Sequence, residues 1–77
     1  MADLWLVPAT VELFPADRGR YRLSVLWTNG QRGKLDGPAN DVKAAQTILL
    51  EAMSHQAVVN VSRWPGMKIG SGMEWNW

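Results

Sequence analysis

Basic side chains alternate with apolar ones along short stretches of this sequence, as they do where a strand presents charge on one face. When aromatic rings accompany such a face, it can lie in a groove of DNA or stack single-stranded bases. The whole chain has only eight basic against seven acidic side chains, so its net charge of +1 creates no strong field around it. Nucleic-acid binding is therefore the alternative function, and nucleic acid is not the first partner expected. Its candidate contacts are Arg20, Arg22, Arg32, Lys34, Arg63 and Lys68.

Catalytic and metal-binding chemistry has few suitable residues. His55 is the sole histidine and there is no cysteine, so a metal site of the usual ligand types is not expected. Ser54 directly precedes His55 in a helical stretch, where neighbouring side chains point in different directions and form no nucleophile and base pair. The seven carboxylates show no paired spacing on one element. We therefore expect no enzyme, no metal and no cofactor.

The chain length restricts how the fold is stabilised. Its 77 residues suffice for one small domain, 1–77, near the size at which a single hydrophobic core supports a fold. Without cysteine no disulfide can help, so efficient packing or oligomerisation must do so. Five tryptophans provide large rings that either fill the core or form the hot spots of an interface. No long apolar run or basic leader is present, and we expect a cytoplasmic protein with no membrane contact.

A hairpin of two strands is the clearest local prediction. Over residues 20–28 apolar and polar side chains alternate at period two, and Asn-Gly follows, a strong hairpin signal. A two-residue turn would set Val25 opposite Lys34 and so place charge on the apolar face. We therefore expect a bulge at a nearby glycine that brings Leu35 opposite Val25.

The segment before this hairpin, "LWLVPATVELF", also reads as extended. Pro8 lacks a backbone N–H, so it suits an edge strand or a bend. The alternation places Val11 and Leu13 on one side, and turn-forming residues follow in "PADRG".

One helix is expected over residues 40–56, with Asn40 as its N-cap and Asp41 at the positive end of the dipole. Placing residues at about 100° intervals puts Leu50 on the polar side, where a single exposed leucine is ordinary. The apolar stripe consists of Val42, Ala45, Ile48, Leu49, Ala52 and Met53.

A second hairpin is predicted after the helix. The stretch "AVVNVSRW" is rich in strand formers, and Trp64-Pro65-Gly66-Met67 fits a type II turn. A tight turn pairs Trp64 with Met67, Ser62 with Ile69 and Val58 with Met73. Valines then fall on one face and larger apolar side chains on the other.

Together these elements predict an α+β fold in the order β(β)βαββ, with a small antiparallel sheet of four to five strands packed against one helix. The core forms where Val42, Ala45, Leu49 and Met53 meet Val25, Val59 and Val61. The second sheet face is apolar, and it needs the N-terminal strand, a second copy or a protein partner to cover it. The candidate partner contacts are Trp64, Met67, Ile69, Met73, Trp75, Trp77 and Leu50.

The element order in "PADRGRYRLSVLWTNGQRGKLDGPANDVKAAQTILLEAM" and "VVNVSRWPGMKI", within residues 15–69, resembles that of small phage-encoded anti-CRISPR proteins with a ββαββ layout. The resemblance implies a non-enzymatic inhibitor in the bacterial host cytoplasm. It would dock on a type I CRISPR surveillance complex and block DNA binding or nuclease recruitment. Because the chain is not acidic, a docking surface is favoured over DNA mimicry. Protein binding of this kind is the first expected function, and a homo-oligomer is a further expectation.

Overall fold

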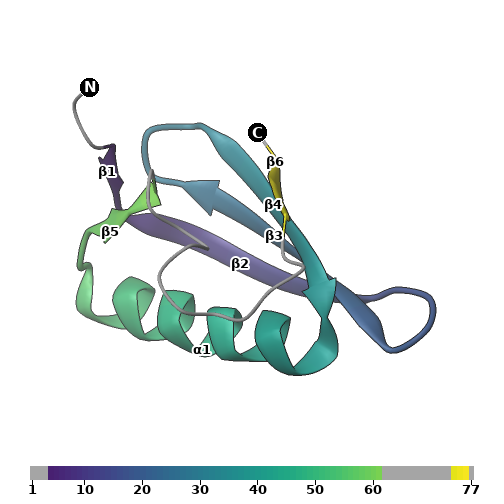
Figure 1. Ribbon diagram of the computed structural model, residues 1–77. Coiled ribbons are helices and arrows are strands. Elements are labelled where there is room, and N and C mark those ends of the chain that lie inside the picture. Colours follow the sequence, from purple (N-terminus) through teal and green to yellow (C-terminus); the bar gives the residue numbers. More distant parts are fainter. Residues whose placement is uncertain (1–3, 62–73, 77) are drawn as a thin grey trace.

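A computed structural model describes residues 4–61 and 74–76 of the chain (Figure 1). Within these ranges the fold is α+β, as the sequence predicts, and one helix follows the first four strands. The elements are β1 (Trp5–Leu6), β2 (Pro8–Pro15), β3 (Arg20–Trp27), β4 (Arg32–Pro38), α1 (Ala39–His55), β5 (Val59–Asn60) and β6 (Glu74–Asn76).

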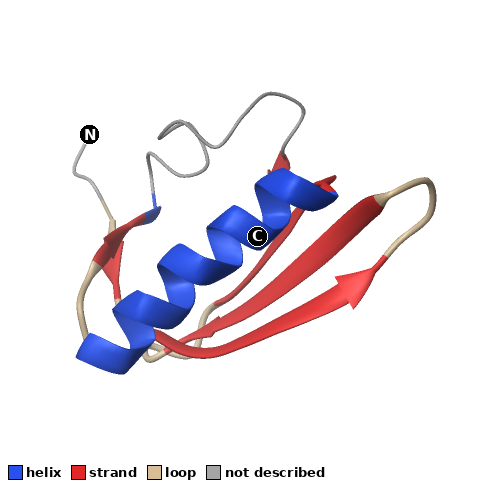
Figure 2. Cartoon of the chain, turned by 90° about the horizontal axis from the view of Figure 1, so that it is seen from below, coloured by secondary structure: helices blue, strands red, loops and turns tan. Residues whose placement is uncertain are grey.

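The strands form two antiparallel sheets. The larger has the order β2-β3-β4-β6, and the smaller consists of β1 and β5. Figure 2 shows α1 lying along one side of the larger sheet, so this sheet has a helix face and an opposite face. The predicted sheet of four to five strands against one helix is confirmed, with four strands in the larger sheet.

The N-terminal segment divides at its proline. Pro8 begins β2, which occupies an edge of the larger sheet, and the β2–β3 register shifts between Pro8 and Thr10. Both predicted roles of the proline, edge and bend, are thus confirmed. Val11 pairs with Val25 and Leu13 with Leu23, so the two β2 residues share the helix face with the core of β3.

The β2–β3 turn uses two residues in the left-handed region. The Arg20 N–H donates to the Asp17 carbonyl (3.2 Å), and the central residues Arg18 and Gly19 have φ of 60° and 70°. Positive φ at both central positions is the type I′ pattern, which suits hairpins because its twist matches that of the strands. Arg18 is a poor residue for this position, since left-handed backbone strains most side chains other than asparagine and glycine.

Replacing Arg18 by asparagine should therefore stabilise the protein by about 0.5–1 kcal/mol, because asparagine tolerates this backbone region. For a domain of this size the gain corresponds to a rise in Tm of a few degrees. Thermal unfolding followed by circular dichroism measures it. Arg18→Val, with a β-branched side chain in the same position, should lower Tm, and a rise with valine would contradict the assigned turn.

The β3–β4 hairpin has a register that the sequence did not predict. Val25 pairs with Gly33 and Leu23 with Leu35, instead of Val25 with Leu35. The reason is a three-residue loop, 28–30, which is closed by the Trp27 N–H donating to the Gln31 carbonyl (2.9 Å) and contains Gly30 at φ 92°. A two-residue turn would have paired Val25 with Lys34 and placed charge on the helix face. The three-residue loop avoids this by pairing Val25 with Gly33, one residue away from Lys34 in the direction opposite to the predicted bulge.

Among the described residues, ten buried ones form the hydrophobic core between the helix and the sheets. Val42, Ala45 and Leu49 supply it from α1 and are fully buried, as predicted. Met53, also expected there, is half-buried. The core consists of Leu6, Leu23, Val25, Trp27, Leu35, Val42, Ala45, Leu49, Val59 and Val61.

Two predictions for the helix are wrong. Ile48 does not belong to the buried stripe and is 44% exposed, because it points about 100° away from the fully buried Leu49. Asn40 is not the N-cap, because the helix begins at Ala39 directly after the extended Pro38. The Ala39 N–H instead donates to the Gly19 carbonyl (3.0 Å), so a carbonyl of the β2–β3 turn satisfies a donor that a side-chain cap would have bound.

The C-terminal hairpin cannot be compared directly. The predicted pairs around Pro65-Gly66 involve residues 62–73, which lie outside the described residues. The described strands on either side of this range belong to different sheets, since β5 pairs with β1 and β6 with β4.

Candidate binding surfaces

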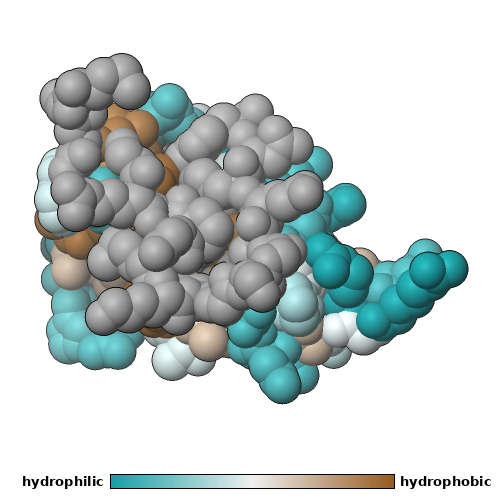
Figure 3. Space-filling model, viewed as in Figure 1, coloured by the Kyte–Doolittle hydropathy of each residue, from teal (hydrophilic) through white to brown (hydrophobic). Residues whose placement is uncertain are grey.

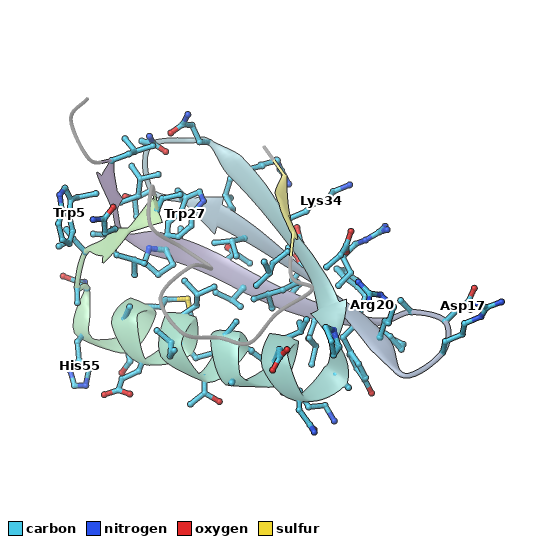
Figure 4. The ribbon with its side chains drawn as sticks, in the orientation of Figure 1. Trp5, Asp17, Arg20, Trp27, Lys34 and His55 are labelled. Carbon is cyan, nitrogen blue, oxygen red and sulfur yellow. The ribbon has the colours of Figure 1, made fainter. Side chains whose placement is uncertain are left out.

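The first candidate surface is the face of the larger sheet that points away from α1. Because side chains alternate along a strand and the odd-numbered residues of β3 face the core, the even-numbered ones point outward. Figure 4 shows Arg20 and Lys34 on this side. We call it the open sheet face and define it as Thr10, Glu12, Phe14, Arg20, Arg22, Ser24, Leu26, Arg32, Lys34 and Asp36.

On β2, β3 and β4 the open sheet face is predominantly cationic, so the apolar second sheet face predicted from the sequence is not found on these strands. The open sheet face carries four basic and two acidic side chains, and one of each is paired, since Arg22 Nε donates to Asp36 Oδ1 at 2.9 Å. Both partners are well exposed, so the pair contributes only about 0.2–1 kcal/mol to stability. For the other three cations, Arg20, Arg32 and Lys34, no ion pair is present within the described part of the chain.

An open hollow of about 370 Å³ lies at the end of this face near the β2–β3 turn. Phe14 lines it from β2 and is 44% exposed, a large fraction for a phenylalanine. Arg22, Ser24 and Lys34 line it from the two strands that follow. The hollow thus combines an aromatic ring, a hydroxyl, two cations and the carboxylate of Asp17. Its full lining is Phe14, Pro15, Ala16, Asp17, Arg22, Ser24 and Lys34.

The second candidate surface is the opposite end of the molecule, where β1 and β5 lie. Trp5 is 55% exposed and Val58 is 56% exposed, although both are apolar. Leu4 is also exposed there, next to β1. Figure 3 shows hydrophobic residues at this end and hydrophilic ones at the end formed by the β2–β3 turn, and Figure 4 places Trp5 and Asp17 at these two ends. We call the surface of Leu4, Trp5 and Val58 the apolar end.

A second hollow, of about 450 Å³, adjoins the start of β2 and the C-terminal part of the helix. The Thr28 N–H donates to the Val7 carbonyl (2.9 Å), so the β3–β4 loop is tied to the segment that follows β1. The lining is apolar with two polar side chains, and consists of Val7, Pro8, Ala9, Thr28, Met53 and Gln56.

The structure brings together four of the six cations proposed for nucleic-acid binding: Arg20, Arg22, Arg32 and Lys34 share the open sheet face. Of the proposed protein contacts, Leu50 lies on the exposed side of α1, as predicted, and is 38% exposed. For Trp75 the structure describes the backbone, which pairs with Leu35 in β6. The remaining candidates lie outside the described residues, namely Arg63, Trp64, Met67, Lys68, Ile69, Met73 and Trp77.

Three exposed residues were missed by the sequence reasoning. The sequence pattern gives Trp5 and Val58 no role beyond that of strand residues. For Trp5, the strand-breaking Pro8 three residues later could have indicated an exposed ring. Phe14 follows Glu12 by two positions and Thr10 by four, so its polar neighbours on the same face could have indicated exposure.

The described residues contain no group of three His, Cys, Asp or Glu side chains placed to hold a metal ion. His55 is exposed in the last turn of α1 and lines neither hollow, although its neighbour Gln56 lines the second. None of the described helices is long and apolar enough to cross a membrane.

Comparison with known proteins gives no further assignment: no family model, no curated protein and no solved structure matches this chain.

Proposed function

We propose that this protein is a non-enzymatic binding protein that docks on a protein partner through its apolar end. In keeping with the resemblance of its size and element order to anti-CRISPR proteins, the proposed partner is a type I CRISPR surveillance complex in the bacterial cytoplasm. Docking would block DNA binding or nuclease recruitment by that complex.

The exposure of Trp5 is the observation that carries this proposal. Burying an exposed tryptophan removes a large apolar area from water, and tryptophan is among the residues most enriched at interface hot spots. Val58 and Leu4 add apolar surface at the same end, and the neighbouring hollow has Thr28 and Gln56 in its lining. An apolar centre with polar groups around it is the usual composition of a protein interface.

A binding experiment with a purified type I surveillance complex tests the proposal. The wild-type protein should bind the complex and reduce its retention of target DNA in a gel-shift assay. Trp5→Ala should weaken binding at least tenfold, since hot-spot truncations cost 2 kcal/mol or more. Phe14→Ala is the matched control, because it removes a similarly exposed ring from the opposite end, and it should bind within twofold of the wild type.

Two results would contradict the proposal: no interaction with the complex, or equal losses for Trp5→Ala and Phe14→Ala. Light scattering of the isolated protein tests a second copy as the occupant of this end. A dimer that dissociates in Trp5→Ala would assign the apolar end to self-association instead.

A further inference from the structure

Positive charge is unevenly distributed over the described residues. Five of the six basic side chains there belong to the larger sheet or its β2–β3 turn, and only Lys43 lies on the helix. Lys43 is also engaged elsewhere, with its Nζ 4.9 Å from the centre of the Tyr21 ring. The small net charge of the whole chain therefore conceals a local excess on one side.

The strand register arranges this excess in rows across the open sheet face. Phe14, Arg22 and Asp36 lie in one row, because Phe14 pairs with Arg22 and Arg22 with Asp36. Ser24 pairs with Lys34 in the next row. Arg32 lies one row further along β4, opposite Leu26. Because same-face residues along a strand are roughly 7 Å apart, Lys34 and Arg32 are neighbours on this face.

The cations that have no ion pair with a described residue are the groups that an anionic ligand would neutralise. Asp36 already binds Arg22, and the other carboxylate of the face on β2, β3 and β4, Glu12, lies in the row of Lys34. On β2, β3 and β4 four cations stand against two carboxylates, an excess of +2 before β6 is counted, where Glu74 pairs with Asp36. A polyanion is therefore favoured there over a neutral or cationic partner.

The residues that line the hollow favour a polyanion that also contains a planar group. Phe14 presents its exposed ring beside Lys34, Arg22 and the Ser24 hydroxyl, so a planar group stacked on the ring would have its charged substituents next to cations. A nucleotide has both parts, a flat base and a phosphate. Stacking on an exposed ring requires a base that is not paired in a duplex, which favours a single strand.

We propose that the open sheet face is a binding site for single-stranded nucleic acid, with a base stacked on Phe14 and phosphates held by Lys34 and Arg32. This site is separate from the apolar end, so it goes beyond the docking function. A protein with both surfaces binds a partner at one end and presents a cationic face to nucleic acid on its sheet. With these two phosphate contacts, the logarithm of the affinity should fall with the logarithm of salt at a slope of about −1.4.

Fluorescence anisotropy with a labelled oligothymidine strand, alone and as a duplex with oligoadenine, tests this site. The single strand should bind more tightly than the duplex at low salt. Phe14→Ala should weaken binding of the strand about tenfold, because a stacked base is lost. Lys34→Gln should weaken it severalfold and make the salt slope shallower by about 0.7, since one phosphate contact is lost.

Two variants serve as controls. Lys43→Gln removes the same charge from the helix, and Trp5→Ala removes a ring from the apolar end; both should retain the affinity of the wild type within twofold. Near-ultraviolet circular dichroism confirms that each variant is folded. If Trp5→Ala weakens binding of the protein partner but leaves the affinity for the oligonucleotide unchanged, the two surfaces act independently.

Several outcomes would overturn the site. Equal losses for Lys34→Gln and Lys43→Gln would mean that overall charge alone attracts the strand. Equal or tighter binding of the duplex would exclude stacking on Phe14. Failure of the folded wild-type protein to bind the strand at low salt, together with binding of an acidic protein that Lys34→Gln weakens, would assign the face to protein instead.

Discussion

Replacing Trp27 by alanine should remove a large part of the protein's free energy of unfolding at 25 °C. Trp27 is only 1% exposed and is the largest of the fully buried side chains. Truncating a buried tryptophan costs about 3–5 kcal/mol, through the lost burial and the cavity that remains. A domain of this length has a total stability of only about 4–12 kcal/mol, so the loss consumes much or all of it. Far-ultraviolet circular dichroism in a urea series measures the effect.

The matched control is Trp5→Ala, which removes the same side chain from a position that is 55% exposed. It should change the free energy of unfolding by less than about 1 kcal/mol, in the range of surface substitutions. Similar urea midpoints for the two variants would contradict the placement of Trp27 in the core. Trp27→Phe, which retains an aromatic ring, should recover part of the stability.

Replacing Leu49 by alanine should destabilise the protein by about 2–5 kcal/mol. Leu49 lies in the middle of α1 and is fully buried against the sheet side of the core. Because alanine has a higher helix propensity than leucine, the substitution doesn't weaken the helix itself. The loss therefore reports on packing alone, and urea unfolding of both proteins measures it.

The neighbouring residue supplies the control. Leu50→Ala makes the same chemical change at the next position, which points about 100° away and is 38% exposed. It should cost less than about 1 kcal/mol. A larger loss from Leu50→Ala than from Leu49→Ala would mean that a different face of α1 is buried.

The parts of the fold that follow from local pattern were predictable. The alternation in β3 identifies Leu23, Val25 and Trp27 as one face, and all three are buried. The loop between β3 and β4 was not predictable, because Asn-Gly fits both a two-residue turn and the three-residue loop with Gly30 at positive φ. The pairing of β6 with β4 joins residues far apart in sequence, and no local pattern specifies such a partner.

For the candidate surfaces, features of a single strand were predictable from the sequence, whereas features that depend on strand pairing were not. Period-two charge predicted that Arg20 and Arg22 share one face of their strand and that Arg32 and Lys34 share one face of theirs, because alternation depends only on the strand to which each residue belongs. That the two pairs share one sheet face follows from the register of β3 and β4. The ring of Phe14 joins them through β2, and that pairing becomes evident only in the folded sheet. Trp5 was overlooked because its exposure depends on the division of the N-terminal segment into β1 and β2 at Pro8.

The pairing of β1 with β5 has a consequence for the order in which the protein folds and opens. Trp5 pairs with Asn60, so this two-stranded sheet joins distant parts of the chain, whereas β2, β3 and β4 connect through short loops. Contacts between distant residues require the greatest loss of chain entropy, and small elements tend to open first in native hydrogen exchange. The amides of β1 and β5 should thus exchange faster than those of β2, β3 and β4. A partner bound at Trp5 would slow this exchange, because its binding energy would add to the stability of the closed state.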